Sequence, residues 1–403
     1  MTLVLFLILL SILVLVHELG HFLMAKRAGI LVEEFGLGYP PRIWGKKIGE
    51  TIYSINLFPI GGFVKLYGEE GLPASDSSSE ATKGRAFFEK SKKARLGVIL
   101  AGVVMNYLLA IFVFAGLYSA SGIPVTTDKV MVVGIGPDSP AEKVGLKVDD
   151  QILSLNGEGF ASWKEFIEKT KESSGKLVKL EVKREKDNPC LEKVLGGGTI
   201  DFQKSSTQVS SESEKFSCLG ENLLFWVTPR ENPPEGQGPL GVAISSIEMK
   251  KYPLWQRPFY GAVKGFQESI VWGKTITQAL IQMLRDLIFK GQVPKDVAGP
   301  IGVYQVTGMV AKTGLMAVLE FLGILSVNLA IVNVLPFPAL DGGRLLFLLI
   351  EAVFGKKLAP KLEAWVNNLG MVLLLIFVLL ITINDIARIF STNPLWQKIR
   401  SVF

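Results

Sequence analysis

Four stretches of the chain are apolar over lengths that suit a membrane-spanning helix. They lie within residues 1–25, 96–120, 315–354 and 367–387. A helix that crosses the hydrocarbon core of a bilayer needs about 20 residues. The pattern therefore predicts an α-helical polytopic membrane protein with about four transmembrane helices.

The segments between these stretches mix apolar and polar positions and predict interfacial or water-exposed structure. Residues 26–95 include a strand-like pattern at about 50–68, interrupted by a Pro-Ile-Gly-Gly turn, which predicts a hairpin or a β-loop dipping toward the membrane. Residues 125–247 predict a soluble domain of strands and short helices with a Ser-rich insertion at 186–222. Residues 253–312 predict an amphipathic helix, along the membrane surface or on the helix bundle, followed by a Gly- and Pro-punctuated link.

Composition agrees with a membrane protein that has a substantial water-exposed part. Hydrophobic residues make up 49% of the chain, yet charged residues still make up 20%, and the mean hydropathy is +0.36. The net charge of +6 comes without an array of basic and aromatic residues, which argues against nucleic-acid binding. Cys190 and Cys218 flank the Ser-rich stretch; they form a disulfide if this part lies outside the cytoplasm, and two unpaired thiols are the alternative.

The positions of basic residues predict the orientation of the first two helices. Lys26 and Arg27 follow the first apolar run, and a cluster at 90–95 precedes the second. By the positive-inside rule, residues 26–95 are cytoplasmic, and the N-terminus and the 125–247 domain face outward. Four spans then return the C-terminus to the outer side, although the basic residues of the C-terminal tail count against this.

The first apolar run contains three polar residues that are costly at membrane depth, His17, Glu18 and His21, and His17 and His21 are the only two histidines of the chain. Two imidazoles four residues apart lie on one helix face and can bind the same metal ion. In this HExxH pattern the histidines bind zinc, and Glu18 is placed to take a proton from water as a general base. The alternative is that both histidines only pack in the helix bundle, which the cost of polar groups at membrane depth disfavours.

A catalytic zinc needs a third protein ligand, and Asp341 is the main candidate. It lies in a Pro- and Gly-broken stretch of an otherwise apolar region, where an unpartnered carboxylate would be costly. The predicted topology brings it to the same membrane side as His17 and His21. Glu320 and Glu351 are weaker candidates at the two ends of the region.

Several motifs together resemble one enzyme family. They are HELGH at 17–21, GGFVKLYGE at 61–69, GPIGVYQVTG at 299–308 and NVLPFPALDGG at 333–343. They are similar to sequences of the site-2 protease family of intramembrane zinc metalloproteases, and within it to the bacterial regulator-of-sigma-E protease (RseP) group. The resemblance implies an extracytoplasmic PDZ-like α+β domain at 125–247 and a membrane re-entrant β-loop.

The resemblance also implies roles for individual residues. His17, His21 and Asp341 bind Zn²⁺, and Glu18 is the general base. Asn328 and Asn333 match asparagines that hold the unwound substrate, and amides in a span can pair with exposed backbone groups; hydrogen bonds between helices are the equal alternative. The β-loop binds the substrate as an added strand through the segment Gly62, Phe63, Val64 and Lys65.

The predicted function is a zinc endopeptidase of the bacterial cytoplasmic (inner) membrane that cleaves transmembrane segments near the cytoplasmic side. The predicted substrates are single-span membrane proteins, either anti-sigma-factor-like regulators or signal-peptide remnants. A PDZ-bearing membrane scaffold or chaperone with a non-catalytic metal site is the main alternative. A membrane metallopeptidase with its HExxH motif in a cytosolic domain is a third, which the position of the motif in the first apolar run disfavours.

Overall fold

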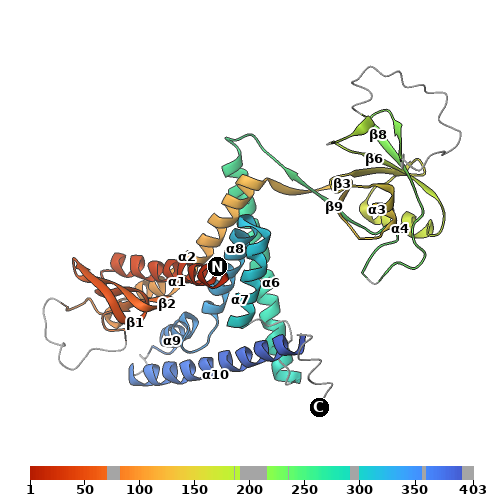
Figure 1. Ribbon diagram of the computed structural model, residues 1–403. Coiled ribbons are helices and arrows are strands. Elements are labelled where there is room, and N and C mark those ends of the chain that lie inside the picture. Colours follow the sequence, from red (N-terminus) through yellow and green to blue (C-terminus); the bar gives the residue numbers. More distant parts are fainter. Residues whose placement is uncertain are drawn as a thin grey trace, which may run out of the picture. The chain divides into compact units, whose positions relative to one another are not determined.

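The computed structural model describes residues 1–69, 82–185, 187–190, 216–234, 236–290, 299–355 and 360–392 (Figure 1). The chain forms two compact units. One comprises Met1–Gly122 and Tyr252–Phe403 and contains the long helices, and the other comprises Ile123–Lys251.

Four helices in the described residues are long and apolar enough to cross a membrane. They are α1 (Thr2–Arg27), α2 (Lys92–Ser121), α8 (Leu315–Val334) and the Leu362–Ile383 part of α10 (Pro360–Thr392). A polytopic membrane protein with four candidate spans is therefore confirmed. A short 3₁₀ helix, η1 (Phe87–Glu89), precedes α2.

Small residues allow the helices of this unit to approach closely. A side chain at Gly20 of α1 would overlap the carbonyl oxygen of Ala101 in α2. Helix α6 (Arg257–Lys290) packs lengthwise on α2, with Gly261 and Gly265 against its backbone (Figure 1). Of the two placements predicted for the amphipathic helix, the structure therefore has the one on the bundle, where backbones pack through small residues.

The predicted link after this helix is wrong for residues 300–313, which form a further helix, α7 (Pro300–Thr313). Proline is well tolerated in the first turn of a helix, so Pro300 starts α7 rather than preventing it. The buried carboxylate of Asp385 in α10 accepts hydrogen bonds from the backbone N–H groups of Gly299 and Gly302 and satisfies the start of the helix.

The region 315–354 is two helices rather than one. Helix α8 ends at Val334, and α9 (Asp341–Phe354) begins after a break that contains both prolines of the motif. Proline disfavours helical backbone in the residue before it and removes a backbone donor, which explains the break. Asp341 is consequently the first residue of a helix.

Two long strands, β1 (Val32–Ile48) and β2 (Thr51–Leu66), pair beside α1. Of the two alternatives predicted here, the hairpin, in which the segments before and after the Pro-Ile-Gly-Gly turn pair with each other, is wrong. Residues 34–37 of β1 lie between them and pair with residues 62–65 on one side and 52–55 on the other. The turn that reverses the chain is at 49–50, between Ile48 and Thr51, and the segment 62–65 lies last in this order.

The described residues of the unit Ile123–Lys251 form an antiparallel sheet together with short helices. Its strands are β3 (Ile123–Ile135), β4 (Gln151–Leu155), β5 (Glu158–Gly159), β6 (Val178–Lys183), β7 (Phe216–Leu219), β8 (Asn222–Val227) and β9 (Val242–Lys250). Their order is β7-β8-β6-β4-β3-β9, with β5 on β4. Helices α3 (Pro140–Val144) and α4 (Trp163–Glu172) complete the unit. Its core contains Val132, Leu180, Val182 and Phe225, so the α+β character predicted for 125–247 is present.

The predicted insertion at 186–222 is partly ordered sheet. Residues 191–215 lie outside the described part of the chain, but β7 and the start of β8 fall within the predicted range and pair with each other. Phe216 and Cys218, two residues apart on β7, both pack against the core of the unit, which accounts for a strand at this position. A disulfide joins Cys190 to Cys218.

Candidate metal centre

Helix α1 presents two imidazoles from one face, one turn apart. The Nε2 atoms of His17 and His21 lie 3.2 Å from each other. His17 is buried, and the side chain of His21 is only 12% exposed. Both Nε2 atoms therefore point to one place inside the helical unit.

Asp341 brings a carboxylate to the same place from the start of α9. Its Oδ2 atom lies 3.1 Å from His17 Nε2 and 3.3 Å from His21 Nε2. This oxygen is buried and accepts no hydrogen bond from the described residues. The three donor atoms lie within 4.8 Å of one another. Two imidazoles and one carboxylate are the donor set of a catalytic zinc that keeps a position open, so the residues fit this metal.

Two glycines explain how α9 can start this close to the end of α8. A side chain at Gly342 would overlap the carbonyl oxygens of Val334 and Leu335, and one at Gly343 would overlap the carbonyl oxygen of Phe337. Only glycine allows the first turn of α9 to fold back on the chain that precedes it. The Gly-Gly pair after Asp341 thus fixes the position of the carboxylate.

One face of α2 lines the two imidazoles at a spacing of four residues. The carbonyl oxygen of Val98 accepts a hydrogen bond from His21 Nδ1 at 2.8 Å. A side chain at Gly102 would overlap His21 Nε2 and lie 2.7 Å from His17 Cε1. The amide nitrogen Nδ2 of Asn106 lies 3.3 Å from His17 Nδ1. The α2 helix therefore contacts both rings along one of its faces.

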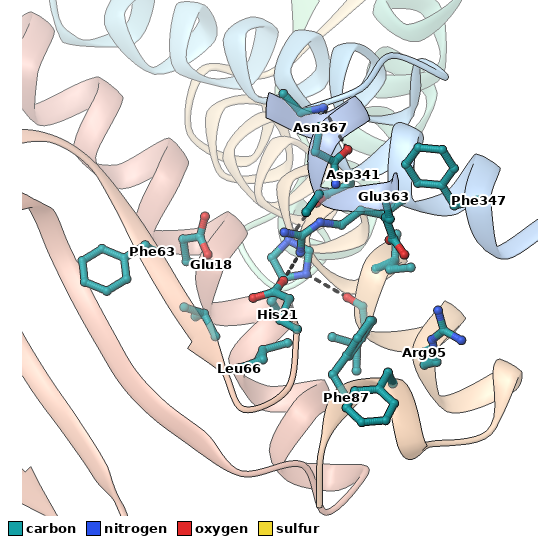
Figure 2. Close-up of a pocket in the computed structure, with 18 of the residues that line it drawn as sticks. Glu18, His21, Phe63, Leu66, Phe87, Arg95, Asp341, Phe347, Glu363 and Asn367 are labelled. Carbon is teal, nitrogen blue, oxygen red and sulfur yellow. Dashed lines mark hydrogen bonds and ion pairs between the residues drawn. The ribbon is translucent and has the colours of Figure 1, made fainter. Parts of the chain in front are cut away.

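The three donor residues open on a cavity of about 740 Å³ (Figure 2). Figure 2 shows Glu18, His21 and Asp341 around it, with Phe63 and Leu66 of β2 on one side and Glu363 and Asn367 of α10 on another. Two ion pairs line the cavity: Arg95 with Glu351 at 2.6 Å, and Arg344 with Glu69. A polar cavity with a convergent donor set is a site where water and a polypeptide segment can meet.

Comparison with known proteins identifies the family. The chain matches Peptidase family M50 over residues 5–377. A candidate zinc metalloprotease of Clostridium perfringens is 33% identical over 93% of this chain and 96% of its own length. The chain belongs to peptidase family M50.

Two further relatives of this M50 protein carry the name RasP. The regulator of sigma-W protease RasP of Bacillus subtilis is 30% identical over 96% of this chain and 99% of its own length. The zinc metalloprotease RasP of Geobacillus kaustophilus is 30% identical over 96% of this chain and 97% of its own length. The resemblance to the site-2 protease family is thus confirmed, and the chain is a zinc metalloprotease, a hydrolase whose cofactor is Zn²⁺.

Not all residues predicted for substrate binding lie at the cavity of this M50 protein. Gly62, Phe63 and Val64 line it. Asn333 is not among the residues that line the cavity, but its amide nitrogen lies 3.3 Å from His17 Nε2. Lys65 does not line the cavity; its ammonium pairs with Glu33 at 2.7 Å.

The remaining candidates among the predicted residues lie away from the donor atoms. Asn328 is exposed on α8 and is not among the residues that line the cavity. Glu320 is exposed at the start of the same helix. Glu351 lines the cavity but is paired with Arg95. Of the three carboxylates considered as a third ligand, only Asp341 joins the two imidazoles.

Three contributions to this site were not predicted from the sequence. They are the carbonyl group of Val98, the missing side chain at Gly102 and the amide of Asn106. A backbone carbonyl leaves no signal in a sequence, and glycine is common in membrane helices for packing alone. The one available signal was Asn106, a polar side chain in a span that has no charged residue.

Proposed function

We propose that this M50 protein is an intramembrane zinc endopeptidase that hydrolyses peptide bonds within the transmembrane segments of its substrates. The observation that supports this is the convergence of His17, His21 and Asp341, because the two histidines belong to α1, a candidate membrane span. This position also argues against an HExxH motif in a separate cytosolic domain.

In the proposed mechanism, His17 Nε2, His21 Nε2 and Asp341 Oδ2 hold the zinc. Bound zinc would act as a Lewis acid that polarises a carbonyl group and acidifies water. Glu18 follows the first ligand and lines the same cavity. Its carboxylate would take the proton from the attacking water and pass it to the leaving amine, which is the task of a general base and then a general acid.

The segment 62–64 would bind the substrate as an added strand. It ends the order of paired segments in the β1–β2 sheet and lines the cavity. A side-chain carbon at Gly62 would lie 3.7 Å from Cγ of Glu18, so this strand passes directly beside the proposed base. An extended substrate paired here would present its peptide bond to Glu18. Asn333, beside His17, would bind the backbone of the unwound segment.

The substrates we propose are single-span membrane proteins: membrane-anchored regulators of the anti-sigma-factor type and remnants of signal peptides. The name of the Bacillus subtilis relative, a regulator of sigma-W protease, supports the first class. We place the enzyme in the bacterial cytoplasmic membrane, with its active site toward the cytoplasm and with both termini and the unit Ile123–Lys251 outside. In this proposal that unit is a PDZ-like domain.

Replacement of the base tests the mechanism. Glu18→Gln should leave zinc content unchanged and lower cleavage of a single-span substrate in proteoliposomes by at least about 10²–10⁴-fold. Glu248→Gln, the same change at an exposed carboxylate of the other unit, is the matched control and should cleave normally. Cleavage by Glu18→Gln at the normal rate would refute the assigned base.

Replacement of the ligands separates the protease from a scaffold with a non-catalytic metal. Asp341→Ala and His17→Ala should each lose stoichiometric zinc together with cleavage. Zinc retained by both variants would refute the ligand set. Normal zinc in the wild type without cleavage of any single-span substrate would favour the scaffold.

A further inference from the structure

Each imidazole of the candidate metal centre has a partner on α2 at its Nδ1 atom. His21 Nδ1 meets the carbonyl oxygen of Val98, and His17 Nδ1 meets the amide of Asn106. Val98 and Asn106 are eight residues apart on α2, and Gly102 lies midway, so all three share one helix face. The two contacts therefore form a matched pair on a single element.

The Val98 contact determines where the proton of His21 resides. A carbonyl oxygen only accepts hydrogen bonds, so His21 Nδ1 must carry the hydrogen. In a neutral imidazole the other nitrogen, Nε2, then keeps its lone pair. This is the atom that faces Asp341, and a lone pair there is what a metal requires.

His17 needs the same tautomer, and Asn106 can enforce it. Asn106 is fully buried, and its Oδ1 atom accepts no hydrogen bond from the described residues. An amide presents either its oxygen or its nitrogen to a neighbour, depending on rotation about its Cβ–Cγ bond. In the structure the nitrogen Nδ2 faces His17 Nδ1 and leaves Oδ1 without a partner. With the two amide atoms exchanged by rotation about this bond, Oδ1 accepts the hydrogen of His17 Nδ1 and is itself satisfied.

The backbone of Asn106 is itself held in place. The hydroxyl group of Ser326 in α8 donates a hydrogen bond to the Asn106 carbonyl oxygen at 2.7 Å, and Ser326 is fully buried. This hydrogen bond ties the backbone that carries the Asn106 side chain to α8. This anchoring makes Asn106 suited to orient a ring rather than merely to fill space.

We infer that Asn106 is a positioning residue for the metal centre: its Oδ1 accepts a hydrogen bond from His17 Nδ1–H and so keeps Nε2 free for zinc. The inference rests on the proposed zinc ligands. Partners of this kind behind a metal-binding histidine fix its tautomer and orientation, and their loss lowers metal affinity about 10–100-fold.

The wild-type protein allows a direct test, because the chain contains only two histidines. The zinc-loaded full chain in detergent, labelled with ¹⁵N in histidine, should give four ring-nitrogen signals. We expect a protonated Nδ1 on both rings, and in Asn106→Leu a shift of the His17 signals while those of His21 stay in place. An unprotonated His17 Nδ1 in the wild type, or unchanged His17 signals in the variant, would overturn the inference.

Zinc affinity, measured by competition with a chromophoric chelator, gives a second readout. Asn106→Leu should bind zinc about 10–100-fold more weakly, whereas Asn106→Asp, which keeps an acceptor of the same shape, should stay close to the wild type. Val104→Leu, an exposed position on the same helix, is the control for added bulk. Unchanged affinity in Asn106→Leu, or equal losses in Asn106→Leu and Asn106→Asp, would refute the acceptor role.

The reference variant His17→Ala separates the two levels of the proposal. If His17→Ala keeps its zinc, the proposed ligand set is wrong. If His17→Ala loses zinc while Asn106→Leu keeps it, only the role of Asn106 is wrong. Should Asn106→Leu fail to fold, the wild-type spectrum and Asn106→Asp still decide the question.

Discussion

Two clusters of buried polar groups, one in each unit, differ in whether the protein itself satisfies all of their polar atoms. In the unit Ile123–Lys251, Asp150 and Arg184 form a buried pair with two contacts of 2.7 Å, and the Asp150 carboxylate also accepts from the backbone of Lys147. In the helical unit, Oδ2 of Asp341 and Oδ1 of Asn106 are buried without a hydrogen bond from the described residues. The first arrangement is complete within the protein, and the second has atoms available to a ligand.

This difference distinguishes buried polar groups that stabilise the fold from buried polar groups that are available to bind a ligand. A buried pair whose hydrogen bonds are complete contributes to folding, and its loss leaves an uncompensated charge. Buried donor atoms that converge without partners are costly for the fold and are retained for binding. Substitutions in the two units should therefore be distinguishable by which measurement they change.

The largest expected effect is on the Asp150–Arg184 pair. Asp150→Ala leaves the buried guanidinium of Arg184 without its carboxylate partner and should destabilise the unit Ile123–Lys251 by about 3–5 kcal/mol. Hydrogen exchange of β4 and β6 in the full chain, followed by mass spectrometry, measures this. Zinc affinity should stay at the wild-type value. Weakened zinc binding in Asp150→Ala would contradict the separation between the two units.

The disulfide gives the next largest effect, in the same unit. Cys190 and Cys218 are 28 residues apart, and a cross-link over such a loop stabilises a fold by about 3–4 kcal/mol in the chain-entropy description. The variant with both cysteines replaced by alanine should lose this much protection from hydrogen exchange in β7 and β8. Thiol labelling should rise from none to two groups on reduction; equal labelling with and without reductant would refute the bond.

In the helical unit, Gly102→Ala should change zinc binding rather than folding. The new methyl group would overlap His21 Nε2 and displace the rings from their common point. Misplacement of a reacting group by about 1 Å can cost about 100-fold in rate, so cleavage should fall by about that factor, with weaker zinc binding. Gly116→Ala is the matched control on the same helix, because its added carbon meets no atom within 4 Å. Normal cleavage by Gly102→Ala would show that the rings tolerate the methyl group.

The sequence predicted those site residues whose polar side chains cost free energy at membrane depth. His17, Glu18 and Asp341 are polar residues in apolar stretches, and each lies at the cavity. Asn328 met the same criterion but is exposed on α8. The free-energy cost of a polar side chain at membrane depth thus identifies candidate residues. Whether a candidate faces the cavity or the outside of the helices depends on how the helices pack.

The missed elements have physical explanations. Strand β1 contains three glycines and the Pro40–Pro41 pair, which hide its pattern of alternation. Helix α7 starts at Pro300, directly after Gly299, and this Gly-Pro pair is typical of a loop. The carboxylate of Asp385 in α10 accepts a hydrogen bond from Gly299 and so favours a helix start here. Both β1 and α7 depend on contacts with residues far away in the sequence, and the local sequence pattern carries no information about such contacts.

The smallest expected effect is on the exposed ion pair of the unit Ile123–Lys251, and it tests whether burial decides the cost. Lys129 and Glu248 pair at 2.9 Å, close to the 2.7 Å of the Asp150–Arg184 pair, but their side chains are 46% and 50% exposed. Water and salt screen such a pair, so Lys129→Ala should change stability by no more than about 1 kcal/mol. Hydrogen exchange of β3 and β9 measures this. A loss as large as that of Asp150→Ala would mean that contact distance, not desolvation, sets the cost of removing an ion pair, and burial would no longer explain why the Asp150–Arg184 pair stabilises this unit.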